Sequence, residues 1–230
     1  MSRKRSERSY APGRTRRLLL DAALDLFAEH GFSRTAMQDV VERAGMTKGA
    51  FYHHFNTKDD ALRELHDEFL DRVTAALGLA LDRYTTPTEQ LAQIAYDVAM
   101  VCIIYQKHVA VFFRDQRALD EDVRRPILER RRAFTRSVRD VVRAGIERGE
   151  FSAHLDPDTA ALGVLGMAIW TYQWYRPDGS RSAEELAQQV SGMALAALGA
   201  RTLTPVSVPA KVDTVRSELS PALEVPRREA

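Results

Sequence analysis

The chain has 230 residues, with 33 Lys and Arg against 32 Asp and Glu, and a single cysteine, Cys102. Its length suits one or two domains, and 45% hydrophobic with 28% charged residues excludes a disordered chain. One cysteine excludes an internal disulfide and a cysteine-rich zinc site, which favours a reducing, cytoplasmic compartment. The longest uncharged run, residues 159–175, is short for a transmembrane helix and contains polar residues, so no membrane segment is expected.

The near-neutral charge is an average over two unlike parts of the chain. Residues 1–57 hold ten Lys and Arg against six Asp and Glu, whereas the remaining residues hold 23 against 26. A basic first quarter followed by a mildly acidic body indicates an N-terminal module that meets a polyanion. Charge alone leaves open the alternative of a basic tail that only aids solubility.

Apolar residues recur at helical spacing almost throughout, and no run alternates with the period of a strand. We therefore predict an all-α protein of nine helices. Gly31 and Gly45 are expected to end the first two helices, while Thr35 and Thr47 cap the second and third.

Longer helices are expected after these three. An arginine-rich helix should begin between Asp122 and Arg125, because Pro126 must lie in its first turns, and should end near Arg148. From residue 201 the chain has four of its nine prolines and no aromatic residue, which indicates a disordered tail. The other predicted helices are residues 58–81, 88–106, 109–119, 159–175 and 183–198.

The three short helices have the layout of a helix-turn-helix, in which the last helix enters the major groove of DNA. Lys48 stands at the N-terminus of the third helix, where backbone N–H groups favour a phosphate. Gly49 lets the backbone approach a facing group closely. Phe51 and Phe55 are spaced to pack inward.

The stretch AGMTKGAFYHHFNTKDDAL at residues 44–62 resembles the tetracycline-repressor (TetR) family of bacterial transcriptional regulators. The first-helix pattern around Leu19 and Phe27 belongs to the same resemblance, which covers about residues 14–65. Val40-Val41 in place of Ile-Ala, and Thr47 in place of Ser, are mild departures from the family's pattern. The resemblance implies a disordered basic arm (1–13), a helix-turn-helix DNA-binding domain (14–57), a ligand-binding and dimerisation domain (58–200) and the tail (201–230).

The resemblance also implies contacts with double-stranded operator DNA, of which phosphate contacts position and base contacts specify. Phosphate contacts are implied for Thr35, Thr47, Tyr52 and Lys58, and contacts with base edges or the adjacent backbone for Lys48, Gly49 and His53. Core packing for Tyr52 and a solvated helix start for Lys58 are the structural alternatives. Two interpretations are open for Arg3, Lys4 and Arg5: they reach a minor groove or phosphates, or they belong to a flexible tail that makes no contact with DNA.

Members of the family pair to read a palindrome, so a homodimer is expected. Residues 159–175 are apolar nearly all round and must be buried on more than one side. Together with the final helix they resemble the family's four-helix dimer interface; the alternative is that both helices are interior to a monomer. The expected interface residues are Leu162, Gly163, Gly166, Leu186, Val190, Met193 and Ala197.

Aromatic and branched residues of the body form either an ordinary core or a pocket for a small-molecule effector. Apolar lining beside arginines would suit a ligand with an apolar chain and a phosphorylated head. The candidate ligand-binding residues are Tyr96, Met100, Ile103, Ile104, Phe112, Phe113, Arg130, Phe134, Val138, Met167, Trp170 and Trp174.

The run WTYQWYRPDG, which starts at Trp170, resembles the branch of TetR regulators that answers acyl-coenzyme A thioesters in fatty-acid or steroid catabolism. The same run could equally be a structural turn at the dimer interface. The resemblance implies a repressor that an effector, an acyl-CoA, releases from its operator by favouring a dimer with wrongly spaced recognition helices. A hydrophobic drug-like effector is the alternative.

No catalytic site is expected, and with it no cofactor and no metal. No His pair at i, i+4 carries an adjacent Glu, and the chain has neither a glycine-rich phosphate loop nor a G-x-S-x-G elbow. Cys102 lies among apolar residues and is expected to be a buried, inert thiol. A ligand-independent DNA-binding protein and an uncharacterised enzyme are the more distant alternatives.

Overall fold

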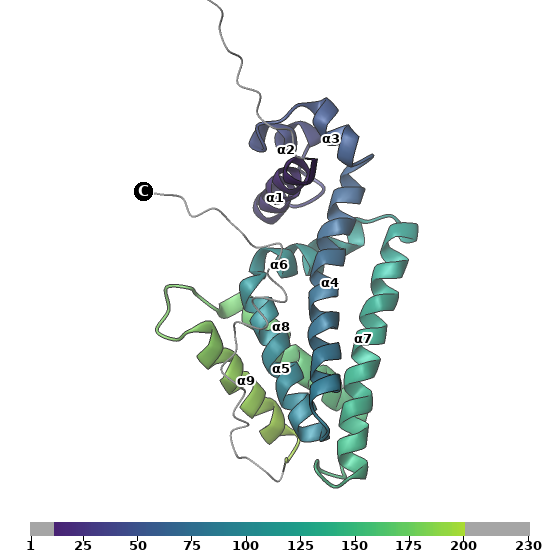
Figure 1. Cartoon of the computed structure of the whole chain (residues 1–230), viewed down its shortest axis with the longest axis vertical. Helices are drawn as coiled ribbons and strands as arrows, with labels where there is room; N and C mark the ends of the chain where they lie inside the picture. The colour runs from purple at the N-terminus through teal and green to yellow at the C-terminus, as the bar shows by residue number, and fades with distance from the viewer. Residues whose placement is uncertain (1–11, 201–230) are drawn as a thin grey trace, which may run out of the picture.

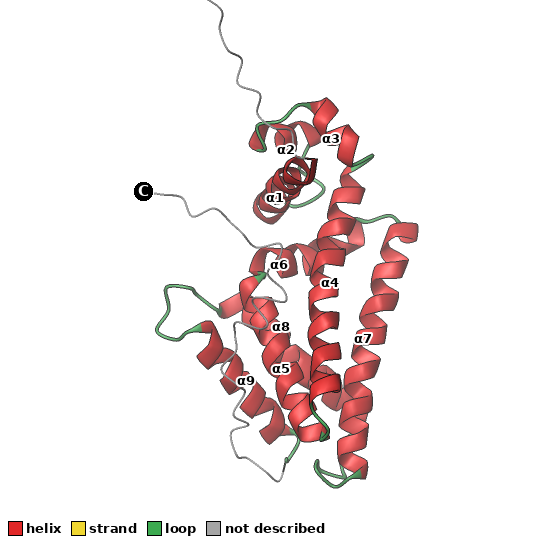
Figure 2. Ribbon diagram, in the orientation of Figure 1, coloured by secondary structure: helices red, strands yellow, loops and turns green. Residues whose placement is uncertain are grey.

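The computed structural model describes residues 12–200, which form nine α-helices, one short 3-10 helix (Gln116–Ala118) and no strand (Figures 1 and 2). The predicted all-α class and its nine helices are thereby confirmed. The residues predicted as the tail (201–230), and Arg3, Lys4 and Arg5 of the arm, lie outside the described residues. The helices are α1 (Pro12–His30), α2 (Met37–Arg43), α3 (Lys48–His54), α4 (Lys58–Arg83), α5 (Pro87–Ile104), α6 (Gln106–Asp115), α7 (Glu121–Glu147), α8 (Pro157–Trp174) and α9 (Ala183–Ala197).

Helices α1 to α3 gather at one end of the molecule and form a small head (Figure 1). Gly31 and Gly45 adopt φ values of +86° and +64°, which end α1 and α2 as their sequence positions predict. Phe27 and Phe51 are almost fully buried, and the Phe51 ring lies 5.1 Å from that of Phe55. These aromatic side chains fix the orientation of α3 on the rest of the head.

Several helix starts differ from the prediction: α5, α6 and α8 begin at Pro87, Gln106 and Pro157, before the predicted residues 88, 109 and 159. Ala36, not Thr35, precedes α2, and the carboxylate of Asp39 accepts a hydrogen bond from the Ala36 N–H at 3.0 Å. Helix α7 begins at Glu121, one residue before the predicted range, so Pro126 lies inside the helix beyond its first turn. Proline has no backbone N–H, so α7 lacks one hydrogen-bond donor at this exposed position.

The body is built around α5, which is buried on nearly all sides and packs against α4, α7, α8 and α9 (Figure 1). Cys102 is fully buried within it, as predicted, and burial raises the pKa of its thiol to about 12. Helix α4 runs from the head into the body and joins the two. Within residues 12–200 no single helix is long and apolar enough to span a bilayer; α5 and α6 with the 3-10 turn reach that limit only together, bent by 90°.

Candidate DNA-binding head and effector cavity

The outer surface of α3 presents five of the seven residues predicted to contact DNA. Its inner face is anchored by Phe51, while Thr47 caps the helix by accepting a hydrogen bond from the Ala50 N–H at 3.2 Å. Tyr52 is 56% exposed, so the packing alternative for its side chain does not hold. The exposed residues of this surface are Thr47, Lys48, Gly49, Tyr52 and His53.

Thr35 faces the protein interior instead. Its side chain is almost completely buried, and its hydroxyl donates to the carbonyl oxygens of Gly31 at 2.9 Å and Leu26 at 3.3 Å. This hydroxyl therefore ties the residue that precedes Ala36 and α2 to the end of α1. The structure therefore corrects the expectation that the Thr35 side chain contacts a phosphate.

Lys58 is likewise engaged within the chain. Its ammonium group donates to the carbonyl oxygens of Phe32 at 2.8 Å and Thr35 at 3.1 Å, and it lies 4.2 Å from the centroid of the Phe32 ring. The side chain thus joins the start of α4 to the loop between α1 and α2. The side chain therefore positions this loop, and its contact with a phosphate stays a prediction.

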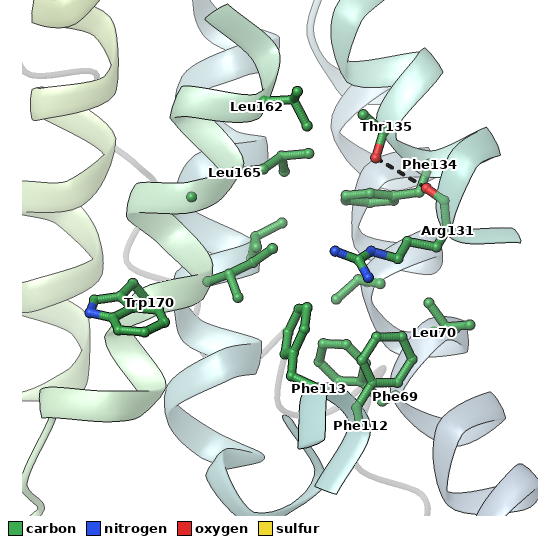
Figure 3. Close-up of a pocket in the computed structure, with 14 residues that line it drawn as sticks. Phe69, Leu70, Phe112, Phe113, Arg131, Phe134, Thr135, Leu162, Leu165 and Trp170 are labelled. Carbon is green, nitrogen blue, oxygen red and sulfur yellow. Dashed lines mark hydrogen bonds between the residues drawn. The ribbon is translucent and has the colours of Figure 1, made fainter. Parts of the chain in front are cut away.

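The body contains a cavity of about 240 Å³ between α4, α5, α6, α7 and α8 (Figure 3). Its walls are almost entirely apolar, with aromatic rings from several helices. The lining residues are Phe69, Leu70, Val73, Val98, Phe112, Phe113, Arg131, Phe134, Thr135, Leu162, Leu165, Gly166, Ile169 and Trp170. An apolar cavity with few polar groups is the usual form of a small-molecule site.

Only part of the predicted ligand set lines this cavity. Phe112, Phe113, Phe134 and Trp170 do so. The other eight do not line it: Tyr96, Met100, Ile103, Ile104, Arg130, Val138, Met167 and Trp174. Arg130 in particular is held outside by α4, where it pairs with Asp67 at 2.8 Å and Asp71 at 2.5 Å.

Arg131 is the charged lining residue that sequence reasoning missed. Its guanidinium carbon lies 5.0 Å from the centroid of the Phe113 ring, and burial lowers the pKa of the group. The lining residues of α4 had a visible signal, since Phe69 and Val73 fall on one apolar helix face. No comparable signal singles out Arg131 among the arginines of α7.

Helices α8 and α9 each expose apolar residues to solvent. Leu162 is 60% exposed and Met193 51% exposed, and Gly163 and Gly166 have open space where a side chain would stand. Ala197 is exposed beside them. This surface, formed by Leu162, Gly163, Gly166, Met193 and Ala197, retains five of the seven predicted interface residues.

Leu186 and Val190, the other two, are buried inside the protomer. Helix α9 packs extensively against α5, which covers this side of it. These two residues therefore belong to the core, and the structure corrects their assignment to a dimer interface.

Helix α6 connects the cavity to the head. Arg114 donates to the carbonyl oxygens of Phe27 and Ala28 at the end of α1, and Lys107 lies 2.5 Å from Asp25 of the same helix. Phe112 and Phe113, immediately before Arg114, line the cavity. One short helix therefore contacts both the proposed ligand space and the DNA-binding head. Residues 12–200 hold no cluster of three or more His, Cys, Asp or Glu that could bind a metal ion.

A helix-turn-helix head on an all-helical body with an apolar cavity is the architecture of a ligand-responsive regulator. Residues 19–65 match the model described as "Bacterial regulatory proteins, tetR family", and residues 84–198 match "Tetracyclin repressor-like, C-terminal domain". The chain therefore belongs to the TetR family of bacterial regulatory proteins. This is a family of regulators and not of enzymes.

Relatives within the family agree with this assignment. The HTH-type transcriptional repressor KstR2 of Mycobacterium tuberculosis (strain ATCC 25618 / H37Rv) is 31% identical over 179 residues, which are 77% of this chain and 89% of KstR2. The solved structure of ketosteroid transcriptional regulator KstR2 of Mycobacterium tuberculosis aligns with a TM-score of 0.74 and 28% identity, covering 80% of this chain and 94% of that one. AibR in complex with isovaleryl coenzyme A and operator DNA has the same fold, with a TM-score of 0.70, 24% identity, and 78% and 97% of the two chains covered.

Proposed function

We propose that the chain is a transcriptional repressor that binds a palindromic operator as a homodimer and releases it when an effector occupies the cavity. The observation that carries the proposal is the exposed surface of α3, which presents Lys48, Tyr52 and His53 on a helix fixed from behind by Phe51 and Phe55. The repressor role is supported by the similarity to KstR2. Acting on chromosomal operators, the protein works in the bacterial cytoplasm.

On DNA, Thr47 and Tyr52 contact phosphates, while Lys48, Gly49 and His53 approach base edges or the adjacent backbone. The operator is obtained by selection from random oligonucleotides. Tyr52→Ala and Lys48→Ala are each expected to abolish operator binding and to leave the helical circular dichroism unchanged. Arg143→Ala, a change at an exposed arginine of the body, is the matched control. Unchanged operator affinity in both head variants would contradict the assignment of α3.

A dimer joined through the apolar surface of α8 and α9 would present two such heads. Two-fold symmetric helix-turn-helix dimers read half-sites about 34–36 Å apart or a multiple of that distance. The exposed glycines allow close approach of helices, as in the four-helix interface that the family resemblance implies. Sedimentation at micromolar concentration is expected to show a dimer, and a stable monomer would defeat this part of the proposal.

For the effector we propose an acyl-CoA thioester whose acyl group enters the cavity. The apolar walls suit an acyl chain or ring and offer few partners to the polar coenzyme. The similarity to KstR2, a ketosteroid transcriptional regulator, and the shared fold of AibR, solved with isovaleryl coenzyme A and operator DNA, support this class.

A thermal-shift screen tests the effector class. A matching acyl-CoA at 100 times its Kd adds about 2.7 kcal/mol to the stability of the folded state. It is also expected to release labelled operator DNA in a fluorescence polarisation assay. A hydrophobic drug-like molecule that stabilises the protein where every acyl-CoA fails would favour the alternative effector.

A further inference from the structure

The cavity contains one charged side chain, Arg131, among the described residues that line it. Figure 3 shows this side chain extending from α7 into the space, with the rings of Phe113 and Phe134 nearby. Thr135 is the other polar lining residue, and its hydroxyl donates to the backbone carbonyl oxygen of Arg131 at 3.1 Å. The remaining walls are hydrocarbon, apart from the Trp170 indole, which is 60% exposed, and the backbone of Gly166.

Several arginines of α7 pair with carboxylates, and Arg132 and Arg136, which have no such partner, are exposed to water; Arg131 is partly buried in the cavity and has none. Arg130 pairs with Asp67 and Asp71, Arg124 with Glu121, and Arg139 with Asp158. Between residues 12 and 200, no carboxylate or carbonyl oxygen accepts a hydrogen bond from the Arg131 guanidinium. Its contact is with the face of the Phe113 ring.

Burying part of a cation without a hydrogen-bond acceptor lowers the stability of the folded state. Removing a charge from water costs several kcal/mol unless an opposite charge or hydrogen-bond acceptors compensate it, and a contact with an aromatic ring returns only a part. Arginine cannot avoid this cost by losing its proton, because its pKa stays too high. The guanidinium fork matches a carboxylate, which it binds through two parallel hydrogen bonds.

We propose that Arg131 is a specificity-determining residue that binds a carboxylate on the ligand, so the cavity takes an apolar carboxylic acid. This inference rests on the proposed function, because it takes the cavity as the effector site, and it narrows the chemistry of the effector. The carboxylate belongs either to a free acid or to an acyl-CoA that carries a second acid group at the far end of its acyl chain. A plain hydrocarbon acyl group would leave Arg131 without a partner.

Calorimetry on the full chain without DNA tests the carboxylate preference. The probes are octanoate and decanoate, each compared with the alcohol of the same chain, which lacks the charge. Decanoate or octanoate is expected to bind the wild type about 10- to 100-fold more tightly than its alcohol, the range for a hydrogen-bonded charged pair. Equal affinities for acid and alcohol would overturn the inference, and so would a failure of both free acids and of decanedioyl-CoA to bind.

Two substitutions test whether the preference for the acid depends on Arg131 itself or on the overall positive charge of α7. Arg131→Met is expected to remove the preference for the acid and to leave the affinity for the alcohol equal or higher. Arg130→Gln removes a neighbouring charge that is already paired with Asp67 and Asp71, and it should keep the preference. Arg131→Met should melt no lower than the wild type, since it replaces an uncompensated cation with an apolar chain. Loss of acid and alcohol binding in equal proportion would show that Arg131 only shapes the cavity.

A last comparison identifies the source of the carboxylate. Decanedioyl-CoA, which carries a free terminal carboxylate, is compared with decanoyl-CoA. Tighter binding of the diacid thioester to the wild type, abolished in Arg131→Met, assigns the carboxylate to an acyl-CoA; binding of the free acids alone assigns it to a free acid. Operator release is measured separately. Ligand binding without release would refute the proposed effector response and leave the role of Arg131 intact.

Discussion

A cation in the head either stabilises the fold or binds DNA, and a substitution of Lys58 distinguishes these two roles. Its ammonium group donates to the carbonyl oxygens of Phe32 and Thr35 and lies over the Phe32 ring. A hydrogen bond from a charged donor contributes about 1.5–3 kcal/mol. A cation–π contact at a partly exposed site adds about 0.5–1 kcal/mol. Since the group is half-buried, we expect Lys58→Met to lower the free energy of unfolding by roughly 2 kcal/mol.

The salt dependence of operator binding then decides between the roles. Removing one phosphate contact reduces the slope of log K against log[salt] by about 0.9, hence by about 1.8 for the two heads of a dimer. Lys58→Met should leave this slope unchanged while it lowers the urea midpoint. Lys48→Met should instead lose operator binding without a change in stability, because the Lys48 side chain is exposed. A Lys58→Met protein with wild-type stability and a flatter slope would refute the structural role.

Three further predictions concern stability and assembly. Gly145→Ala would place a methyl group 2.2 Å from ring carbons of the buried Phe151, so we expect a loss of about 1–3 kcal/mol in chemical denaturation; a wild-type midpoint would contradict this packing. Burial raises the pKa of Asp97 from 3.8 to about 7. Because the carboxyl ionises at a lower pH in the unfolded chain than in the folded one, the free energy of unfolding should fall as the pH rises from about 4 to about 7. Asp97→Asn should remove the part of the fall in melting temperature with pH that is due to Asp97. A melting temperature that depends on pH as in the wild type would contradict the raised pKa of Asp97. Met193→Glu places a charge on the apolar surface of α8 and α9 and is expected to give folded monomers in sedimentation, with persistence of the dimer as the opposing result.

The elements of the head could be predicted from sequence because their signals are local. Gly31 and Gly45 adopt the positive φ that their positions imply, and Thr47 caps the helix that directly follows it. Thr35 and Lys58 were assigned through family resemblance, which matches positions in a motif. Their partners are carbonyl oxygens that folding brings from elsewhere, up to 26 residues away for Lys58, and a motif does not contain that information.

Which residues line the cavity could be predicted only in part from the sequence. Arg130 and Arg131 are adjacent, yet about 100° of helical rotation turns one toward the acidic side chains of α4 and the other into the cavity. Apolar spacing marks a face as buried without saying whether that face meets another helix or an empty space. Leu186 and Val190 likewise lie on an apolar face, and that face covers α5 and not a partner. Only the tertiary rotation of each helix distinguishes these outcomes.

The position of α6 limits how a ligand can act on the head. To move a two-state equilibrium from 1:99 to 99:1, a ligand must prefer one state by about 10⁴-fold, or about 5.5 kcal/mol. Arg114 donates to two carbonyl oxygens of α1 and Lys107 pairs with Asp25, so a shift of α6 would change these bonds. Because these side chains are largely exposed, the bonds supply only a part of this free energy. A ligand beside Phe112 and Phe113 therefore need not deform the head, because it has only to favour a position of α6 in which these bonds change.

This coupling must be reciprocal, so saturating operator DNA should weaken ligand binding by the same factor by which the ligand weakens operator binding. Calorimetric titration of the ligand with and without operator measures the first factor, and competition for labelled operator measures the second. Arg114→Ala removes the bonds to α1 and should reduce both factors together, whereas Arg143→Ala should reduce neither. A ligand that binds with equal affinity in the presence and absence of operator would show that the cavity and the head are energetically independent, however close α6 brings them.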